Sequence, residues 1–157
     1  MPSVREALLD AAYTALLTRA WTAVRMVEVA AAAGVSRQTL YNEFGGKDGL
    51  ARALVRRETE TYLAGVDRAL ARRGAGPADD AGARVAAAAA WTLRTARANP
   101  LVRAALTGCW GDRLPAGQDG PGELVGRFRD RAVAALAPGR PRRSCRPWTR
   151  PARPRPG

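Results

Sequence analysis

The chain has 157 residues, of which 26 are Lys or Arg, 14 are Asp or Glu and none is His, so its formal charge at pH 7 is +12. This length suits one ordinary domain, or a small module joined to a second one. The positive charge favours anionic partners such as nucleic acid. Without His, neither a His-based catalytic triad nor a His-containing metal site can be built, and an enzyme would have to use carboxylates or arginines.

The cysteines and the apolar segments bear on where the protein resides. Cys109 and Cys145 are too few for a disulfide framework, and we interpret Cys109 as a small core residue rather than a redox sensor. The longest apolar run, Val85 to Trp91, is too short to cross a bilayer, and no signal peptide is recognisable. We expect a soluble cytoplasmic protein with no membrane partner, no metal site and no cofactor.

The charge is concentrated at the C-terminal end. Residues 138–157 hold seven Arg, six Pro and no acid, and they carry +7 of the total charge. Such a composition cannot bury enough apolar surface to offset the entropy of ordering, so we expect this tail to be disordered. The preceding 137 residues have only a mild excess of +5. Any nucleic-acid site in the folded part must therefore be argued from particular positions.

The first three predicted elements are short helices. Ser3 and Glu6 form a capping box that starts the first helix, and its predicted apolar face comprises Val4, Leu8, Ala11, Ala12, Ala15 and Leu16. A second helix runs from about Met26 to Ala33 and ends at Gly34. Ser36 caps a third helix, on which Leu40 and Phe44 share one face.

Four further helices follow the break at Gly45 and Gly46, and no segment predicts a strand. The fourth helix ends near Arg73, and its inward residues are Leu50, Leu54, Thr61, Tyr62, Val66 and Leu70. Asp79 or Asp80 caps a fifth helix reaching Ala98, with a predicted apolar stripe of Val85, Ala89, Leu93 and Ala96. A sixth runs from Pro100 to Gly108. After a loop from Gly111 to Gly122, a seventh spans 123–137 and presents Leu124, Phe128, Ala132 and Leu136.

The second and third helices have the spacing of a helix-turn-helix, in which the second member lies in the DNA major groove. We expect the two helices to be locked together by Val29, Ala30, Ala33, Gly34, Val35, Leu40 and Phe44. The outward residues would then be Arg37, Gln38, Thr39, Tyr41 and Asn42. Lys47, the only lysine, falls in the first turn of the next helix.

These outward side chains have the chemistry that DNA requires. Gln38 and Asn42 can make paired contacts to adenine, and Arg37 can reach guanine or a phosphate. Thr39 can touch a thymine methyl or a phosphate, Tyr41 can bind a phosphate, and a phosphate would compensate Lys47 at a helix N-terminus. A glycine between two helices is also compatible with an ordinary helical bundle whose polar residues are merely solvated.

A resemblance to a known family favours the DNA-binding reading. The stretch from Val24 to Leu50 reads VRMVEVAAAAGVSRQTLYNEFGGKDGL and closely resembles the DNA-binding signature of the TetR family of bacterial transcriptional regulators. The matching positions are the AGVSR segment at 33–37 and then Thr39, Leu40, Tyr41, Phe44, Lys47 and Leu50. Two positions depart from the pattern: Arg25 replaces the usual Ser or Thr cap, a role that Thr22 could take, and Gly46 stands where Ser is common.

The resemblance implies an all-α homodimer. Its three N-terminal helices would bind a palindromic operator in double-stranded DNA, a fourth would connect, and a C-terminal helical domain would dimerise and bind a small-molecule inducer. It also implies that Gln38, Thr39, Tyr41 and Lys47 contact the operator, with Arg37 and Asn42 beside them. By the same resemblance, the candidate pocket residues are Trp91, Leu101, Leu106 and Trp110, although such a stripe is also typical of a core.

We therefore expect four segments. They are a helix-turn-helix domain at 1–46, a connecting helix at 47–73, a partial ligand-binding and dimerisation domain at 74–137, and the tail at 138–157. About 64 residues, Gly74 to Ala137, are too few for a complete inducer domain. Arg outnumbers Lys by 25 to one, which is typical of GC-rich codons, so the tail is either a frameshift product or a genuine basic arm.

Two functions are compatible with this organisation. The first is a TetR-type repressor that a small-molecule inducer releases from its operator. The second is a truncated or frameshifted regulator that binds DNA weakly as a monomer, without a ligand response. We do not expect an enzyme.

Overall fold

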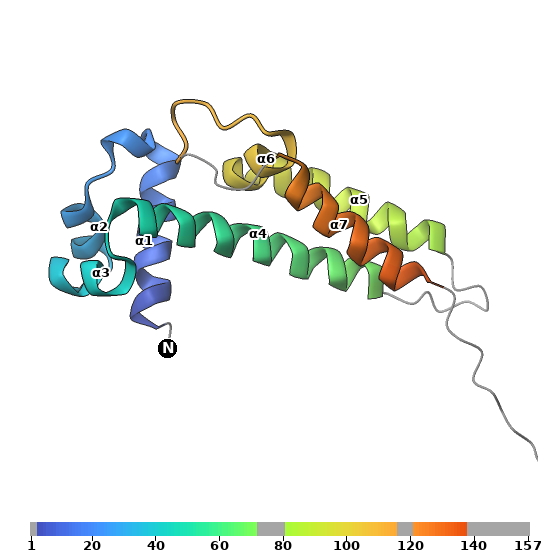
Figure 1. Ribbon diagram of the computed structural model, residues 1–157, viewed down its shortest axis with the longest axis horizontal. Helices are drawn as coiled ribbons and strands as arrows, with labels where there is room; N and C mark the ends of the chain where they lie inside the picture. The colour runs from blue at the N-terminus through green and yellow to red at the C-terminus, as the bar shows by residue number, and fades with distance from the viewer. Residues whose placement is uncertain (1–2, 72–80, 116–120, 138–157) are drawn as a thin grey trace, which may run out of the picture.

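The computed structural model describes residues 3–71, 81–115 and 121–137, and within these ranges the chain is helical with no strand (Figure 1). The elements are α1 (Val4–Thr18), the short 3-10 helix η1 (Trp21–Ala23), α2 (Met26–Ala32), α3 (Arg37–Phe44), α4 (Lys47–Ala71), α5 (Ala81–Ala98), α6 (Pro100–Thr107) and α7 (Pro121–Leu136). The all-α fold class is confirmed. Arg73, Asp79, Asp80, Cys145 and the tail lie outside the described residues.

The helices form a head and a body that share α4. Helices α1, α2 and α3 cluster around the first turns of α4, and α4 then extends away from them alongside α5, α6 and α7 (Figure 1). We call the first group the head and the second the body. Because one continuous helix belongs to both, a change in the tilt of α4 moves the head relative to the body.

Local sequence signals set most of the helix ends. The Ser3 hydroxyl accepts a hydrogen bond from the Glu6 amide at 3.2 Å, whereas the Glu6 carboxylate lies 3.5 Å from Arg57, so only half of the predicted capping box forms. Asn99 caps α6 by accepting from the amides of Leu101 and Val102. The left-handed Gly108, with φ +75°, ends α6 as its position predicts.

Two apolar clusters hold the head and the body. The head cluster includes Leu8, Leu16, Trp21, Val29, Leu40, Leu50 and Leu54. The body cluster includes Tyr62, Leu63, Val66, Leu70, Ala88, Val102 and Leu124. Leu101 of α6 is fully buried in the head cluster, and Trp110 and Leu114 pack against it, so the body contacts the head at a second place besides α4.

Several predicted orientations are wrong. Val4 and Thr61 are exposed, as is Cys109, which is not a core residue. The predicted α5 stripe faces outward: Val85 is 45% and Leu93 is 59% exposed, Ala89 is exposed and Ala96 is half-buried. The reason is that α5 is alanine-rich on several faces, so its one aromatic side chain, Trp91, decides which face packs. In addition, α7 begins at Pro121 rather than at residue 123.

No helix in the described ranges is both long and apolar enough to span a membrane.

Candidate nucleic-acid interface

A tight turn joins α2 to α3 and fixes their relative orientation. Gly34 has a left-handed backbone with φ +70°, which favours glycine, and the Val35 amide donates to the Ala30 carbonyl at 3.0 Å. The Ser36 hydroxyl then accepts from the Thr39 amide at 3.0 Å and starts α3. The helix-turn-helix predicted from the sequence is therefore present, with both of its boundary residues in the expected roles.

The residues predicted to lock the two helices together do so. Val29, Ala30, Leu40 and Phe44 are buried, and Ala33 and Val35 are partly buried against the same cluster. Arg5 of α1 adds a brace from outside, because its guanidinium lies 4.5 Å from the centroid of the Phe44 ring and donates to the Glu43 carbonyl at 3.2 Å. The third helix is thus held against α1 at its C-terminal end.

The opposite face of α3 is polar and open. Arg37, Gln38 and Asn42 are exposed, and Thr39 and Tyr41 are half-buried. The Gln38 side-chain amide donates to the Asn42 side-chain oxygen at 2.9 Å. Arg37 donates to the Tyr41 hydroxyl at 3.3 Å and lies 5.2 Å from the centre of its ring. The side chains one turn apart are therefore paired before any DNA arrives, which reduces the entropy lost on binding.

Lys47 takes part in the head's own structure. Its ammonium donates to the carbonyls of Val24 at 2.7 Å and Thr22 at 3.1 Å, and it lies 5.6 Å from the Trp21 ring centroid. These contacts tie the start of α4 to η1. Thr22 contributes its carbonyl and not a cap, and the N-cap residue of α2, Arg25, makes no side-chain capping hydrogen bond.

A chain of polar contacts joins the head to the body. Arg57 of α4 donates to Asp10 of α1 at 2.6 Å and to Glu58 at 2.8 Å. The other oxygen of Glu58 accepts from the Asn99 side chain at 2.6 Å, and Asn99 caps α6. We call Asp10, Arg57, Glu58 and Asn99 the polar relay. The sequence carries no signal for it, because its hydrogen-bonded partners on different helices are 41 and 47 positions apart.

Burial and charge in this region shift two pKa values. Although burial disfavours the charged guanidinium, the hydrogen bonds that Arg57 donates to Glu58 and Asp10 outweigh it and raise the pKa of Arg57 above its ordinary value. Burial, helped by the nearby charge of Glu58, raises the pKa of the Tyr13 hydroxyl. Arg57 therefore stays charged and Tyr13 stays neutral throughout the physiological range.

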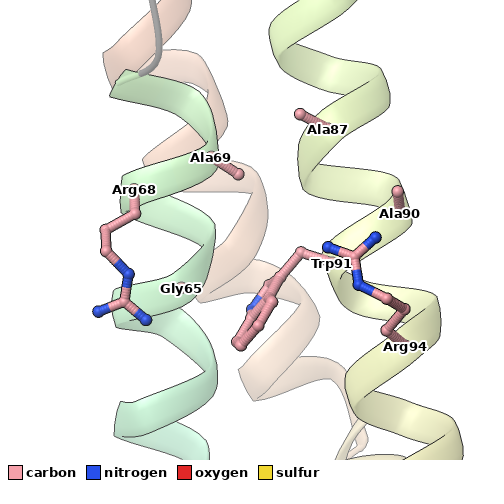
Figure 2. Close-up of a pocket in the computed structure, with 7 residues that line it drawn as sticks. All are labelled: Gly65, Arg68, Ala69, Ala87, Ala90, Trp91 and Arg94. Carbon is pink, nitrogen blue, oxygen red and sulfur yellow. The ribbon is translucent and has the colours of Figure 1, made fainter.

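Among the cavities formed by described residues alone, none is lined by all four predicted pocket residues. Trp91 lies in a groove between α4 and α5, and its ring nitrogen donates to the Tyr62 carbonyl at 3.0 Å (Figure 2). Trp110 lines a separate cavity of about 10 Å³. Leu101 is fully buried in the head cluster, and Leu106 packs on the body cluster. Nor does any group of three or more His, Cys, Asp or Glu among the described residues suit a metal ion.

A helix-turn-helix head carried on a long helix, with a helical body behind it, defines a DNA-binding regulator class. Comparison with known proteins agrees. Residues 8–54 match the family model of bacterial regulatory proteins, tetR family. Over 67 residues the chain is 45% identical to the HTH-type transcriptional regulator AlkX of Mycobacterium tuberculosis, a match covering 43% of this chain and 32% of that protein.

A solved structure extends the likeness beyond the head. The crystal structure of the TetR family repressor AlkX from Dietzia sp. strain DQ12-45-1b, implicated in biodegradation of n-alkanes, superimposes with a TM-score of 0.61 at 31% identity. The match covers 85% of this chain and 68% of that one. The chain therefore belongs to the TetR family, as its signature between Val24 and Leu50 indicates, and it spans about a third of the curated mycobacterial relative.

Proposed function

We propose that this protein is a transcriptional repressor that binds a palindromic operator as a homodimer and is released by a small-molecule inducer. The observation that carries the DNA-binding part is the polar face of α3, where the side chains of Gln38 and Asn42 and those of Arg37 and Tyr41 are paired with one another. The repressor assignment is supported by the likeness to the Dietzia protein, which is a TetR family repressor.

The Gln38 amide is the expected base reader. Asn42 accepts one of its two N–H groups, which leaves the Gln38 oxygen and the other N–H to face a base edge. An acceptor next to a donor complements the N6 and N7 atoms of adenine in the major groove. Asn42 then positions the reader, and Arg37 and Tyr41 supply phosphate contacts that carry no sequence information.

The polar relay is the expected route from inducer to operator. Asn99 sits at the N-terminus of α6, and the relay ends on Asp10 of α1. A ligand that displaces α6 would shift α1 and α4 together, and with them the separation of two recognition helices, which must be about 34 Å to match one turn of DNA. Release then requires only that the inducer bind the displaced state more tightly.

The test is DNA selection followed by affinity measurement. Duplexes enriched from a random pool by the full-length chain should contain paired half-sites with an A·T pair at a fixed position. Gln38→Ala should reduce discrimination against a change of that pair roughly tenfold to a hundredfold, whereas Thr61→Ala, an exposed change on α4, should leave it unaltered. Equal losses of affinity for operator and random DNA would show that Gln38 does not read a base.

Light scattering tests the homodimer. A mass near twice 16.7 kDa is expected, and two tethered half-site contacts then gain roughly 10² to 10⁴ in avidity. A monomer that binds DNA weakly and without sequence preference, with an affinity governed by salt, would replace the proposal with the second function considered from the sequence.

A further inference from the structure

A groove runs between α4 and α5 on the side of the body where Trp91 crosses from one helix to the other (Figure 2). Its volume is about 490 Å³, which lies within the range of roughly 300–1,000 Å³ typical of small-molecule sites. Small side chains, including Ala69 of α4 and Ala87 of α5, form its walls. This groove is separate from the recognition face and from the polar relay.

The floor of the groove is a fixed aromatic surface. A Cβ atom at Gly65 would lie 2.1 Å from the Trp91 indole, so only glycine lets the ring lie this close to α4. The indole N–H donates to the Tyr62 carbonyl at 3.0 Å, which sets the ring's orientation. A flat apolar molecule therefore meets a surface that needs no rearrangement.

Two cations flank the groove. Arg68 of α4 and Arg94 of α5 both line it, and neither makes a hydrogen bond or ion pair within the described part of the chain. The acids nearby on α4 are already engaged, since Glu60 pairs with Arg127 and Asp67 pairs with Arg131 of α7. A guanidinium group is suited to bind a carboxylate, and the groove offers two such groups.

The interior of the body offers far less room. The cavity beside Trp110, which Val55, Thr59 and Leu124 also line, holds about 10 Å³, which is about the space of one water molecule. An organic molecule would have to separate α4, α6 and α7 to enter there. The groove over Trp91, with a volume of about 490 Å³, already has room for one.

We propose that this groove binds an aromatic carboxylate, with the ring against Trp91 and the carboxylate paired with an arginine at the edge of the groove, Arg94 on α5 or Arg68 on α4. The charge of the two arginines selects the anion, and the indole with its alanine walls selects the flat apolar body. This proposal deepens the inducer part of the proposed function, and it rests on that function only for the effect of the ligand on DNA.

Isothermal titration of the full-length chain with naphthoate tests the site directly, and naphthalenemethanol, which has the same ring and no charge, is the matched control. At low salt we expect naphthoate to bind at least tenfold more tightly than naphthalenemethanol. This difference in affinity should shrink as salt is added. Equal binding of the two compounds, or no binding of naphthoate up to millimolar concentration, would refute the proposal.

Variants locate the ligand. Arg68→Ala with Arg94→Ala should weaken naphthoate binding at least tenfold, the corresponding double change to Lys should weaken it less, and Arg97→Ala, an exposed change on the same helix outside the groove, should have no effect. In proton–nitrogen NMR spectra, the indole signal that Trp91→Phe removes should shift with ligand. An equal loss in Arg97→Ala, or a shift confined to other indoles, would place the ligand elsewhere.

DNA binding is measured separately with the selected duplex. If naphthoate bound but left the affinity for the operator unchanged, the groove would be a ligand site but not the inducer site. If the chain bound no DNA, the proposed function would be refuted. The titration would still show whether the groove binds an aromatic carboxylate.

Discussion

Replacing Glu58 by Ala should weaken the junction between head and body. The Glu58 side chain is only 12% exposed and that of Arg57 only 19%. One Glu58 oxygen accepts from Arg57 at 2.8 Å and the other from Asn99 at 2.6 Å. The substitution therefore removes the acceptor for two donors that are largely shielded from water.

The expected loss of stability depends on which contacts of Arg57 remain after the substitution. Breaking a fully buried ion pair costs about 3–5 kcal/mol, but Arg57 keeps Asp10 at 2.6 Å, so we expect Glu58→Ala to lower the free energy of unfolding by about 2–3 kcal/mol. Glu58→Gln keeps the shape and one acceptor oxygen but turns an NH2 group toward the second donor, so it should cost about 1–2 kcal/mol. For a chain of this size, Glu58→Ala corresponds to a fall in Tm of roughly 6–10 °C.

Urea unfolding followed by circular dichroism measures these values, with Glu60→Ala as the matched control. Glu60 lies on the same helix and also pairs with an arginine, but its side chain is 51% exposed, so its loss should cost less than about 1 kcal/mol. If Glu58→Ala were no more destabilising than Glu60→Ala, the polar relay would not join head to body. A double-mutant cycle with Asn99→Ala should show coupling of roughly 0.5–3 kcal/mol.

Three further changes test other contacts. Lys47→Ala leaves two backbone carbonyls without their donor, so it should lower the free energy of unfolding by about 1–2 kcal/mol; a change confined to DNA affinity would contradict this. Gly65→Ala should displace the Trp91 indole, lower stability by about 1–3 kcal/mol and shift tryptophan emission, which an unchanged spectrum would disprove. Burial raises the pKa of the Tyr62 hydroxyl above its ordinary value near 10. The contribution of the neutral Tyr62 to stability is therefore complete below about pH 10 and is lost as the pH rises through the folded-state pKa. Tyr62→Phe should flatten the alkaline fall in Tm.

The head could be predicted because its signals are local. The caps at Ser3 and Ser36 and the left-handed Gly34 each act within a few residues, and each falls where the sequence places it. The helix-turn-helix core and the open polar face of α3 follow from helical periodicity over a segment with one clearly apolar side. The exposure of these residues could therefore be predicted from the sequence.

The body was less predictable because its composition leaves the choice of face open. In α5, alanines surround most of the helix, so periodicity does not distinguish Ala88, which is buried, from Ala89, which is exposed. The packing of Trp91 against Gly65 settles the choice, and it depends on a residue in another helix. The exposure of Cys109 likewise depends on how the segment after α6 leaves the body.

The sequence by itself determined the fold class, the helix-turn-helix of α2 and α3 and the polar, outward face of α3, since these depend on backbone propensity, caps and one-sided apolar patterns within each helix. Only the tertiary structure decided that Lys47 closes the head against η1, that Glu58 links Arg57 to Asn99, and that Trp91 forms the floor of an outer groove beside Arg68 and Arg94. These features are pairings between helices distant in sequence. Their geometry is set by how the helices pack together, which the pattern of residues within one helix does not determine.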